Sequence, residues 1–473
     1  MYAASSSPRE EEEEAMLPHS PQEKPAGYIL RGWESTVGSF SLRRVPRQLW
    51  AVIKPSFLSR TAQKAALLGE TAKPKKKYTT EYLDGIRGVA SLIVFILHWS
   101  HKYYPAVNAG WGYKGNTSFW LLPFVRLIFS GAAMVAVFFV VSGFVLTHRF
   151  IQRMYNLQYN ELFSGLSSLA FRRAIRLYLP SFASSTLAFI CVSLGLVPVP
   201  SKVDGHRFHH GFNAYLDYLD IESNPWSWDA HFDGFYNPQL WSIAVEFRGS
   251  MVVFLLVLGL AKARASVRMA VELFITIHSF AHKRWDVALF IAGMLLAEGE
   301  VWASRRASLP KTKLIKALLV ATLILGLYLC GYPRDGATSS PGFMWSENVW
   351  PYTAYRRRFW LAIGAILSVG AMVFLPTVQA PFVTRPARYL GQISFALYLV
   401  HGLGNRTIGK WLMHRCWDYI GNEGFWPCTL SFVISTTLYF PLVFWASDLF
   451  WRTIDLPSTN FAKWLEQACA PEA

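Results

Sequence analysis

The sequence predicts an all-α, polytopic integral membrane protein: a bundle of about ten transmembrane helices behind a mostly disordered cytosolic N-terminal tail. Of the 473 residues, 52% are hydrophobic and 16% are charged, whereas a typical soluble domain carries about 25% charged residues. Lys and Arg number 46 against 30 Asp and Glu, a net charge of +16. That surplus suits nucleic acid or an anionic membrane face, and the apolar excess argues against nucleic acid.

The first 80 residues differ in composition from the rest. They hold an acidic run at Glu10–Glu14 and end in a basic cluster at Lys73–Lys77, with no hydrophobic segment of the secretory type. The stretch Leu49–Leu68 mixes aromatic and aliphatic residues with Lys and Arg, which favours an interfacial amphipathic helix that Pro55 interrupts. We expect 1–80 to be a cytosolic tail.

From residue 85 onward, apolar segments recur with polar connections. Crossing a bilayer takes about 20 apolar residues. The candidate at 270–282 is the shortest and falls below that length. Ten crossings put both termini on one side. The predicted spans are 85–105, 129–149, 177–197, 240–261, 270–282, 286–302, 317–333, 359–376, 389–409 and 427–451.

The placement of Lys and Arg predicts the orientation. Most of those between spans fall on the side of the N-terminal tail, which the positive-inside rule makes cytosolic. The triplet Arg356–Arg358 falls on the opposite, luminal side, against the rule. Asn116-Thr117-Ser118 is a glycosylation sequon in the first luminal loop. We expect a multi-pass glycoprotein of the endoplasmic reticulum or another endomembrane, with both termini cytosolic.

The predicted luminal loop 198–239 is rich in His and Asp. Their spacing is irregular for metal ligands, so a polar loop that contacts an acceptor, or a merely solvated one, is favoured over a metal site. Cys416 and Cys428 either pair on the luminal side or remain free thiols. The residues considered in the loop are His206, His209, His210, His231, Asp217, Asp220, Asp229 and Asp233.

Ionisable residues inside a span are costly and are functional candidates by default. Arg87 and His98 lie eleven residues apart in the first span, which returns to within about 20° of the same helix face with a ~16 Å axial offset. His suits proton transfer near neutral pH. A packed His and a snorkelling Arg are the alternative, but the pair on one face favours function.

Other spans carry polar groups at helical spacing. Arg173 and Arg176 share a face, and guanidinium groups suit phosphate, although their charge alone fits a positive-inside anchor. Glu246 is a carboxylate at the start of the fourth span. Ser142 and Gly143 favour close helix packing. Ser394, Tyr398 and His401 form one stripe of the ninth span and need partners inside the bundle or a wet cavity.

In order along the chain, these motifs resemble the type-3 integral membrane acyltransferase family, over about residues 80–455. Members of that family move acyl groups from acyl-CoA to hydroxyls of glycans, lipids and natural products, and the long tail looks most like the fungal members. The motifs are Asp84-Gly85-x-Arg87, Arg87-x10-His98, Phe139-x-x-Ser142-Gly143-Phe144, Arg173-x-x-Arg176, Trp241-Ser242-x-x-x-Glu246 and the Ser394/Tyr398/His401 helix.

The resemblance implies a role for each candidate. His98 would be the general base, and Arg87, held by Asp84, would orient groups or stabilise charge at the reaction centre. Arg173 and Arg176 would hold the CoA phosphates at the cytosolic mouth. Glu246 would orient His98 or bind the acceptor. The domain plan is then a tail at 1–80, an acyltransferase domain at 81–455 and a cytosolic C-terminal tail at 456–473.

The expected function is acetyl transfer from acetyl-CoA to a hydroxyl of a small natural product, with the lipid bilayer as the other partner and no metal cofactor. Acylation of a glycan or cell-surface component by the same chemistry is an alternative. A proton-coupled secondary transporter is another, since buried His, Glu and Arg also suit carriers. A transporter is disfavoured because the sequence does not show two corresponding halves with broken helices.

Overall fold

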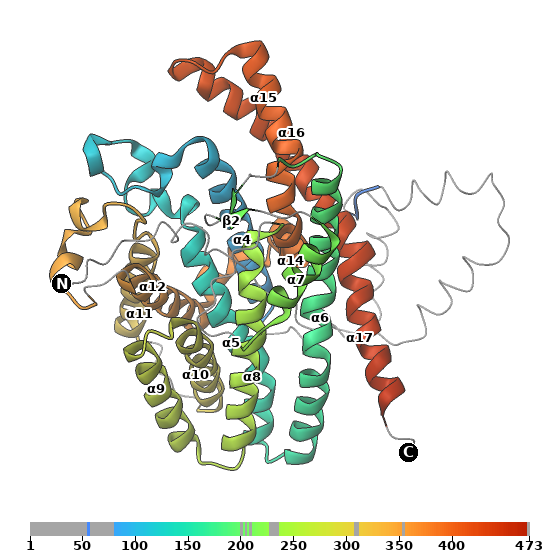
Figure 1. Ribbon diagram of the computed structural model, residues 1–473. Helices are drawn as coiled ribbons and strands as arrows, with labels where there is room; N and C mark the ends of the chain where they lie inside the picture. The colour runs from blue at the N-terminus through green and yellow to red at the C-terminus, as the bar shows by residue number, and fades with distance from the viewer. Residues whose placement is uncertain are drawn as a thin grey trace, which may run out of the picture.

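The computed structural model describes residues 54–56, 80–198, 202–203, 206–207, 211–226, 236–306, 312–351 and 355–470. Most of the predicted tail, including the amphipathic stretch and the basic cluster, lies outside the described residues. So do His209, His210, His231, Asp229 and Asp233 of the predicted luminal loop, and the side chain of His206. Within the described part the chain is a bundle of long helices (Figure 1), which confirms the predicted fold class.

Each of the ten predicted spans coincides with a long helix. These are α4 (Glu81–Tyr103), α5 (Gly131–Tyr155), α6 (Tyr159–Ser193), α8 (Trp241–Leu260), α9 (Ala265–Ala281), α10 (Trp285–Arg305), α11 (Lys313–Cys330), α12 (Tyr355–Phe374), α14 (Arg385–Arg406) and α16 (Phe425–Phe450).

Shorter elements connect and flank these helices. They are α7 (Phe212–Ser223), α13 (Pro376–Gln379), α15 (Ile408–Ile420), α17 (Leu456–Cys469), and the turns η3 (Pro105–Asn108), η4 (Tyr113–Gly115), η5 (Phe119–Leu121), η6 (Val125–Phe129), η7 (Pro238–Leu240), η8 (Ala337–Ser339), η9 (Met344–Asn348), η10 (Ala380–Val383) and η11 (Trp451–Asp455). Strands β1 (Lys202–Val203) and β2 (His206–Arg207) pair antiparallel, with Lys202 opposite Arg207.

Eight helical stretches in the described residues are long and apolar enough to cross a membrane. The fifth and ninth predicted spans are the two that fall short. Helix α9 has 17 residues, as its short apolar run suggested. Helix α14 is less apolar because it carries the stripe of Ser394, Tyr398 and His401 on its buried side.

The third predicted span begins inside a longer helix. Helix α6 begins at Tyr159, well before residue 177, and runs for 35 residues. Hydropathy alone put Arg173 and Arg176 in a cytosolic connection, whereas both lie inside the helix and are buried. Polar partners on neighbouring helices, described below, compensate a buried charge that a hydropathy window counts only as a cost.

Helices α4 and α14 pack closely and run the same way. A Cβ atom at Gly88 would lie 2.4 Å from the backbone nitrogen of Gly391, so these helices meet at glycines. His98 and His401 each follow their glycine by ten positions (88 to 98 and 391 to 401). The two histidines therefore come level further along the pair.

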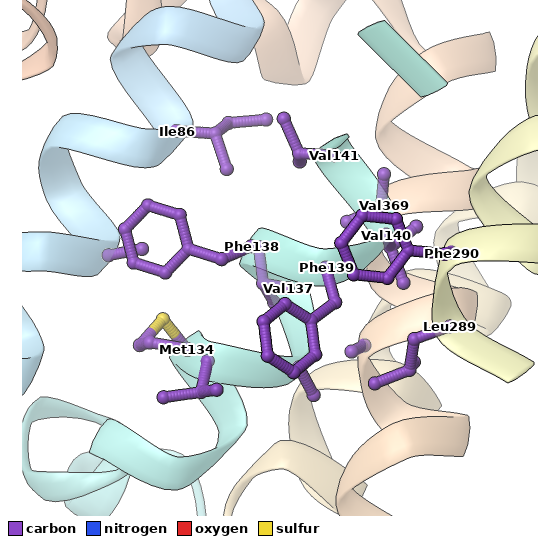
Figure 2. Close-up of a cluster of buried hydrophobic side chains, with 14 of the residues drawn as sticks. Ile86, Met134, Val137, Phe138, Phe139, Val140, Val141, Leu289, Phe290 and Val369 are labelled. Atoms are coloured by element: carbon purple, nitrogen blue, oxygen red, sulfur yellow. The ribbon is translucent and has the colours of Figure 1, made fainter. Parts of the chain in front are cut away.

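Helix α5 lies at the centre of the main apolar core. Figure 2 shows its side chains between Ile86 of α4 and Phe290 of α10, with Val369 of α12 nearby. A Cβ atom at Gly143 would lie 2.0 Å from the Phe290 carbonyl oxygen. The Ser142-Gly143 motif therefore serves the close helix packing that its small residues favoured.

The C-terminal helices lie at the edge of the bundle. Helices α15 and α16 form a hairpin that projects beyond the neighbouring helix ends (Figure 1). Helix α17 packs along α6, where Arg172 Nε lies 3.0 Å from Glu466 Oε2. Cys416 and Cys428, at the hairpin, are free thiols.

Candidate active site

Four of the predicted site residues gather at one level of the bundle. Arg87 comes from α4, Arg173 and Arg176 from α6, and Glu246 from α8. All four side chains are buried. The charges of Arg87 and Arg173 act on each other and on Glu246, and those of Arg87 and Arg173 act on Arg176. We call this group the arginine cluster, and it joins residues from three helices.

Arg173 and Glu246 form a buried ion pair. The Arg173 Nη2 donates to Glu246 Oε1 at 2.6 Å, and its Nε donates to the Ser250 hydroxyl at 2.9 Å. The exposed fractions of the two charged side chains are 3% and 0%. The Ser142 hydroxyl lies beside the same carboxylate. The carboxylate predicted to orient His98 or bind the acceptor is therefore engaged by Arg173.

Arg87 is only partly satisfied. Its Nη1 donates to Asp84 Oδ1 at 3.3 Å, which is the expected contact between them. Its Nε and Nη2 atoms are buried and have no hydrogen-bond partner among the described residues. A buried polar group left unpaired costs about 1–3 kcal/mol. Arg87 therefore has two N–H groups ready for the oxygen atoms of a ligand.

Asp455, which none of the sequence motifs indicated, also belongs to this region. It ends η11, the π-helical turn between α16 and α17, and is buried. Its charge acts on Arg87 and Arg176. Such turns occur frequently at functional sites. The only signal in the sequence was an acidic residue between the last span and Pro457.

The formal charges of the arginine cluster and its carboxylates balance. Its three guanidinium groups face two buried carboxylates, Glu246 and Asp455. Asp84, which pairs with Arg87 and has a side chain that is 44% exposed, supplies a third carboxylate, so the charges sum to 3 − 3 = 0. The capacity of the cluster for an anionic ligand therefore lies in the two unpaired N–H groups of Arg87.

His98 and His401 form a second group further along α4. Their ring centroids are 5.3 Å apart, at 45°. His401 Nδ1 lies 2.7 Å from the Tyr398 carbonyl oxygen and 3.1 Å from that of Leu397. Since carbonyl oxygens accept hydrogen bonds, Nδ1 carries a proton, and in the neutral ring Nε2 is then the acceptor. The histidine pair thus contains one ring whose tautomer is fixed.

A polar network holds the helix that carries His401. The Tyr398 hydroxyl donates to the Gln239 carbonyl oxygen and lies 3.1 Å from the Ser242 hydroxyl. Ser184 of α6 donates to the Leu399 carbonyl oxygen at 2.7 Å. Tyr398 of the polar stripe has therefore found partners on other elements of the bundle, one of the two outcomes that the sequence left open.

The arginine cluster and the histidine pair are separate places. Arg87 and His98 belong to one uninterrupted helix, and eleven residues of helix span ~16 Å. Two side chains on one face at that spacing do not contact the same atom. A ligand that engages both groups must be elongated along α4.

An apolar groove of about 560 Å³ lies between α6 and α8, next to the arginine cluster. The groove lies next to the cluster because two of its lining residues are close in sequence to cluster residues. Ala170 precedes Arg173 by one helical turn, and Met251 directly follows Ser250. The lining suits hydrocarbon rather than phosphate. The residues are Phe163, Leu166, Ser167, Ala170, Met251, Phe254, Leu255 and Leu258.

The fold and these buried polar groups are those of a multi-pass membrane protein. The type-3 acyltransferase family model, described as an acyltransferase domain, matches residues 80–452. The chain therefore belongs to this acyltransferase family, as its motifs indicated.

Fungal proteins are among its relatives. The O-acetyltransferase PaAT-1 of Phomopsis amygdali is 25% identical over 451 residues, covering 88% of each chain. Acyltransferase R4 of Phoma sp. is 24% identical over 82% of this chain and 96% of its own. Acyltransferase clz18 of Cochliobolus lunatus is 24% identical over 81% and 95%. No solved structure matches this chain.

Proposed function

We propose that the protein transfers an acetyl group from acetyl-CoA to a hydroxyl of a small natural product. Family membership and a relative named as an O-acetyltransferase support this. The observation that carries the proposal is the pair of unpartnered Arg87 N–H groups, ~16 Å along the helix from His98. CoA has its phosphates at one end and its thioester at the other, so it is an elongated ligand of the required kind.

In this proposal the arginine cluster binds the phosphates of acyl-CoA. Arg87 Nε and Nη2 donate to phosphate oxygens, with Arg176 beside them. Arg173, held by Glu246 and Ser250, keeps its position and contributes positive charge. The resemblance placed Arg87 at the reaction centre; the distance along α4 favours a role at the phosphate end instead.

The histidine pair carries out the chemistry. His98 accepts the proton of the acceptor hydroxyl while the oxygen attacks the thioester carbonyl carbon. The resulting intermediate breaks its C–S bond, and the leaving thiolate takes the proton from His98. The products are the ester and CoA, with no net change in protons. His401, locked by its carbonyl contacts, packs against His98 and positions its ring.

Labelled acetyl-CoA and a panel of hydroxylated natural products, incubated with the purified protein, test this proposal. Arg87→Lys keeps the charge but cannot reproduce two N–H contacts from one guanidinium edge. We expect it to raise KM for acetyl-CoA about tenfold or more and to leave KM for the acceptor unchanged. Arg415→Lys, on an exposed arginine of α15, is the control.

Two outcomes would overturn parts of this proposal. An unchanged KM for acetyl-CoA in Arg87→Lys would remove Arg87 from the phosphate end. Transfer from an acyl donor without CoA, at a rate equal to that with acetyl-CoA, would reject the cosubstrate. Acetyl-CoA against palmitoyl-CoA in the same assay measures the preferred chain length.

We place the protein in the endoplasmic reticulum or another endomembrane, with both termini cytosolic, because acyl-CoA is cytosolic and most basic connections share that side. Asn116 lies on the first predicted luminal loop, next to exposed Thr117 and Ser118. Glycosidase treatment is expected to shift the wild-type protein on a gel and to leave Asn116→Gln unchanged. A glycan on a sequon engineered at Lys262, in a connection predicted to be cytosolic, would contradict the proposed orientation.

A further inference from the structure

Three residues of the predicted N-terminal tail contact the far end of the chain. Lys54, Pro55 and Ser56 lie beside the junction where α16 passes into η11 (blue in Figure 1). The Ser56 amide donates to Asp448 Oδ2 at 3.0 Å, and the Ser56 hydroxyl donates to Asp448 Oδ1. One tail residue, 392 positions away in the sequence, therefore engages both oxygens of this carboxylate.

Asp448 depends on these donors because it is buried. None of its side chain is exposed, at 0%. Arg452 Nε also donates to its Oδ2, at 3.0 Å. Ser56 thus supplies two of the three hydrogen bonds that the described residues donate to this carboxylate. Since a buried charge that loses its donors is costly, the end of α16 is stable in this form with the tail in place.

Arg452 links the tail to the next element. Its Nη2 donates to the Lys54 carbonyl oxygen at 3.1 Å. Arg452 is the second residue of η11, and Asp455 is the last. The tail is therefore bonded to the last turn of α16 through Asp448 and to the π-helical turn through Arg452. Contacts on both sides of a junction fix its geometry, which a contact on one side would not do.

The turn held in this way reaches the arginine cluster. η11 packs against α6 and α14. Asp455 is buried there, and its charge acts on Arg87 and Arg176. A guanidinium presents its N–H groups in a rigid planar fork, so the carboxylates beside it set the direction in which they point. A displacement of η11 would therefore change how the cluster presents its N–H groups without altering any of its arginines.

We propose that Ser56 is a positioning residue for acyl-CoA binding, which acts by holding η11 and Asp455 against the arginine cluster. The inference rests on the proposed function, in which that cluster binds the phosphates of acetyl-CoA. Loss of the Ser56 contact weakens cosubstrate binding and spares proton transfer at His98, which lies ~16 Å along α4 from Arg87. The predicted tail thereby takes part in the reaction at a distance.

Initial rates of acetyl transfer at varied acetyl-CoA, measured on the purified full chain, test the proposal. Ser56→Ala removes the hydroxyl that bonds Asp448. Contacts remote from a ligand change its binding by about 2- to 30-fold. We expect KM for acetyl-CoA to rise within this range, while kcat and KM for the acceptor keep their wild-type values.

Two further variants separate positioning from a general disturbance. Ser56→Thr keeps the hydroxyl and should restore the wild-type KM for acetyl-CoA. Thr453→Ala is the control, because it removes an exposed hydroxyl from η11 that bonds the Leu449 carbonyl oxygen of α16. It should change neither kcat nor KM.

A double-mutant cycle identifies the route. Asp455→Asn keeps the shape of the side chain and removes its charge. If Ser56 acts through Asp455, the effect of Ser56→Ala on KM for acetyl-CoA should shrink in the Asp455→Asn background. Equal effects in the two backgrounds would overturn the route through η11.

Arg87→Lys, measured in the same assay, separates this inference from the proposed function. A raised KM for acetyl-CoA in Arg87→Lys, with wild-type constants in Ser56→Ala, overturns the role of Ser56 alone. A wild-type KM in both variants overturns the cluster as the phosphate site and the role of Ser56 with it. A fall in kcat at constant KM in Ser56→Ala, or a raised KM that persists in Ser56→Thr, also rejects the positioning role.

Discussion

The arginine cluster and the histidine pair are built around Arg87 and His98, two residues on the same face of α4. They differ in how their polar groups are satisfied. In the arginine cluster, Arg173 has its partners from α8, whereas Arg87 keeps two buried N–H groups unpaired. In the histidine pair, carbonyl oxygens of α14 fix His401. The arginine cluster has N–H groups available for a ligand, and the histidine pair has an imidazole held in one orientation. The difference suggests a division between binding and proton transfer.

The largest effect is expected at the histidine pair. His98→Ala removes the proposed general base, and positioned acid–base groups contribute about 10²- to 10⁴-fold in rate. We expect kcat to fall by that factor while KM for acetyl-CoA is unchanged, the opposite of the result for Arg87→Lys. Initial rates at varied acetyl-CoA measure both constants.

A surface histidine provides the control for this variant. His414 is exposed on α15, so His414→Ala should transfer at the wild-type rate. If His98→Ala also keeps the wild-type kcat, the assignment of His98 as base is wrong, and the division of labour along α4 fails with it.

The second prediction concerns the ion pair in the arginine cluster. Glu246→Ala leaves Arg173 buried without its carboxylate, and breaking a buried pair costs about 3–5 kcal/mol. We therefore expect a large drop in Tm in detergent. Glu272→Ala removes another buried carboxylate, whose oxygens have no hydrogen-bond partner among the described residues, and should not destabilise the protein in this way.

The double variant Arg173→Met with Glu246→Leu sharpens the same comparison. Replacing both charges by apolar groups is often neutral or stabilising, so Tm should recover. The cluster then loses its ion pair but keeps Arg87 and Arg176. Recovery of Tm together with a raised KM for acetyl-CoA would mean that the pair serves binding; unchanged KM would reduce it to a structural role.

The third prediction tests how α14 positions His401. Tyr398→Phe removes the hydroxyl that bonds the Gln239 carbonyl and lies beside Ser242. A buried hydrogen bond contributes about 0.5–1.5 kcal/mol net. We expect a several-fold fall in kcat with KM for acetyl-CoA kept, since the arginine cluster is not touched. A rise in that KM with kcat intact would contradict the separation of the two places.

Local patterns predicted the helices and the stripes on them, but not which helices meet. Hydropathy and a 3.6-residue period are properties of a short window, so Arg87 and His98 on one face, and Tyr398 with His401 on another, were visible. The contact between His98 and His401 depends on the meeting of Gly88 and Gly391, which lie far apart in the sequence.

The same limit explains why the burial of Arg173 and of Asp455 was not predicted. Arg173 is stable inside a helix because Glu246 and Ser250 come to it from α8. A hydropathy window contains only the sequence neighbours of Arg173 and therefore counts its charge as unpaired. Asp455 lies beyond the last apolar segment, and its burial arises from the π-helical turn that leads into α17.

A further prediction is a pH dependence of stability at the end of the bundle predicted to be luminal. Glu222 of α7 is buried and accepts a hydrogen bond from Ser185 at 2.7 Å. Burial raises the pKa of Glu222 to about 8, and the hydrogen bond opposes that rise. Since the folded-state pKa exceeds the unfolded value near 4.5, the folded state holds a proton that the unfolded state has lost across this range. The stabilisation is complete below about pH 4.5 and is lost as the pH rises through 8.

The measurement is the Tm of Glu222→Gln minus the Tm of the wild type, which should therefore grow between these pH values and then level off. The control is Asp220→Asn, at an exposed carboxylate on the same helix, for which the difference in Tm should not change with pH. A flat difference for Glu222→Gln as well would mean that this carboxylate is ionised in the folded protein throughout the range.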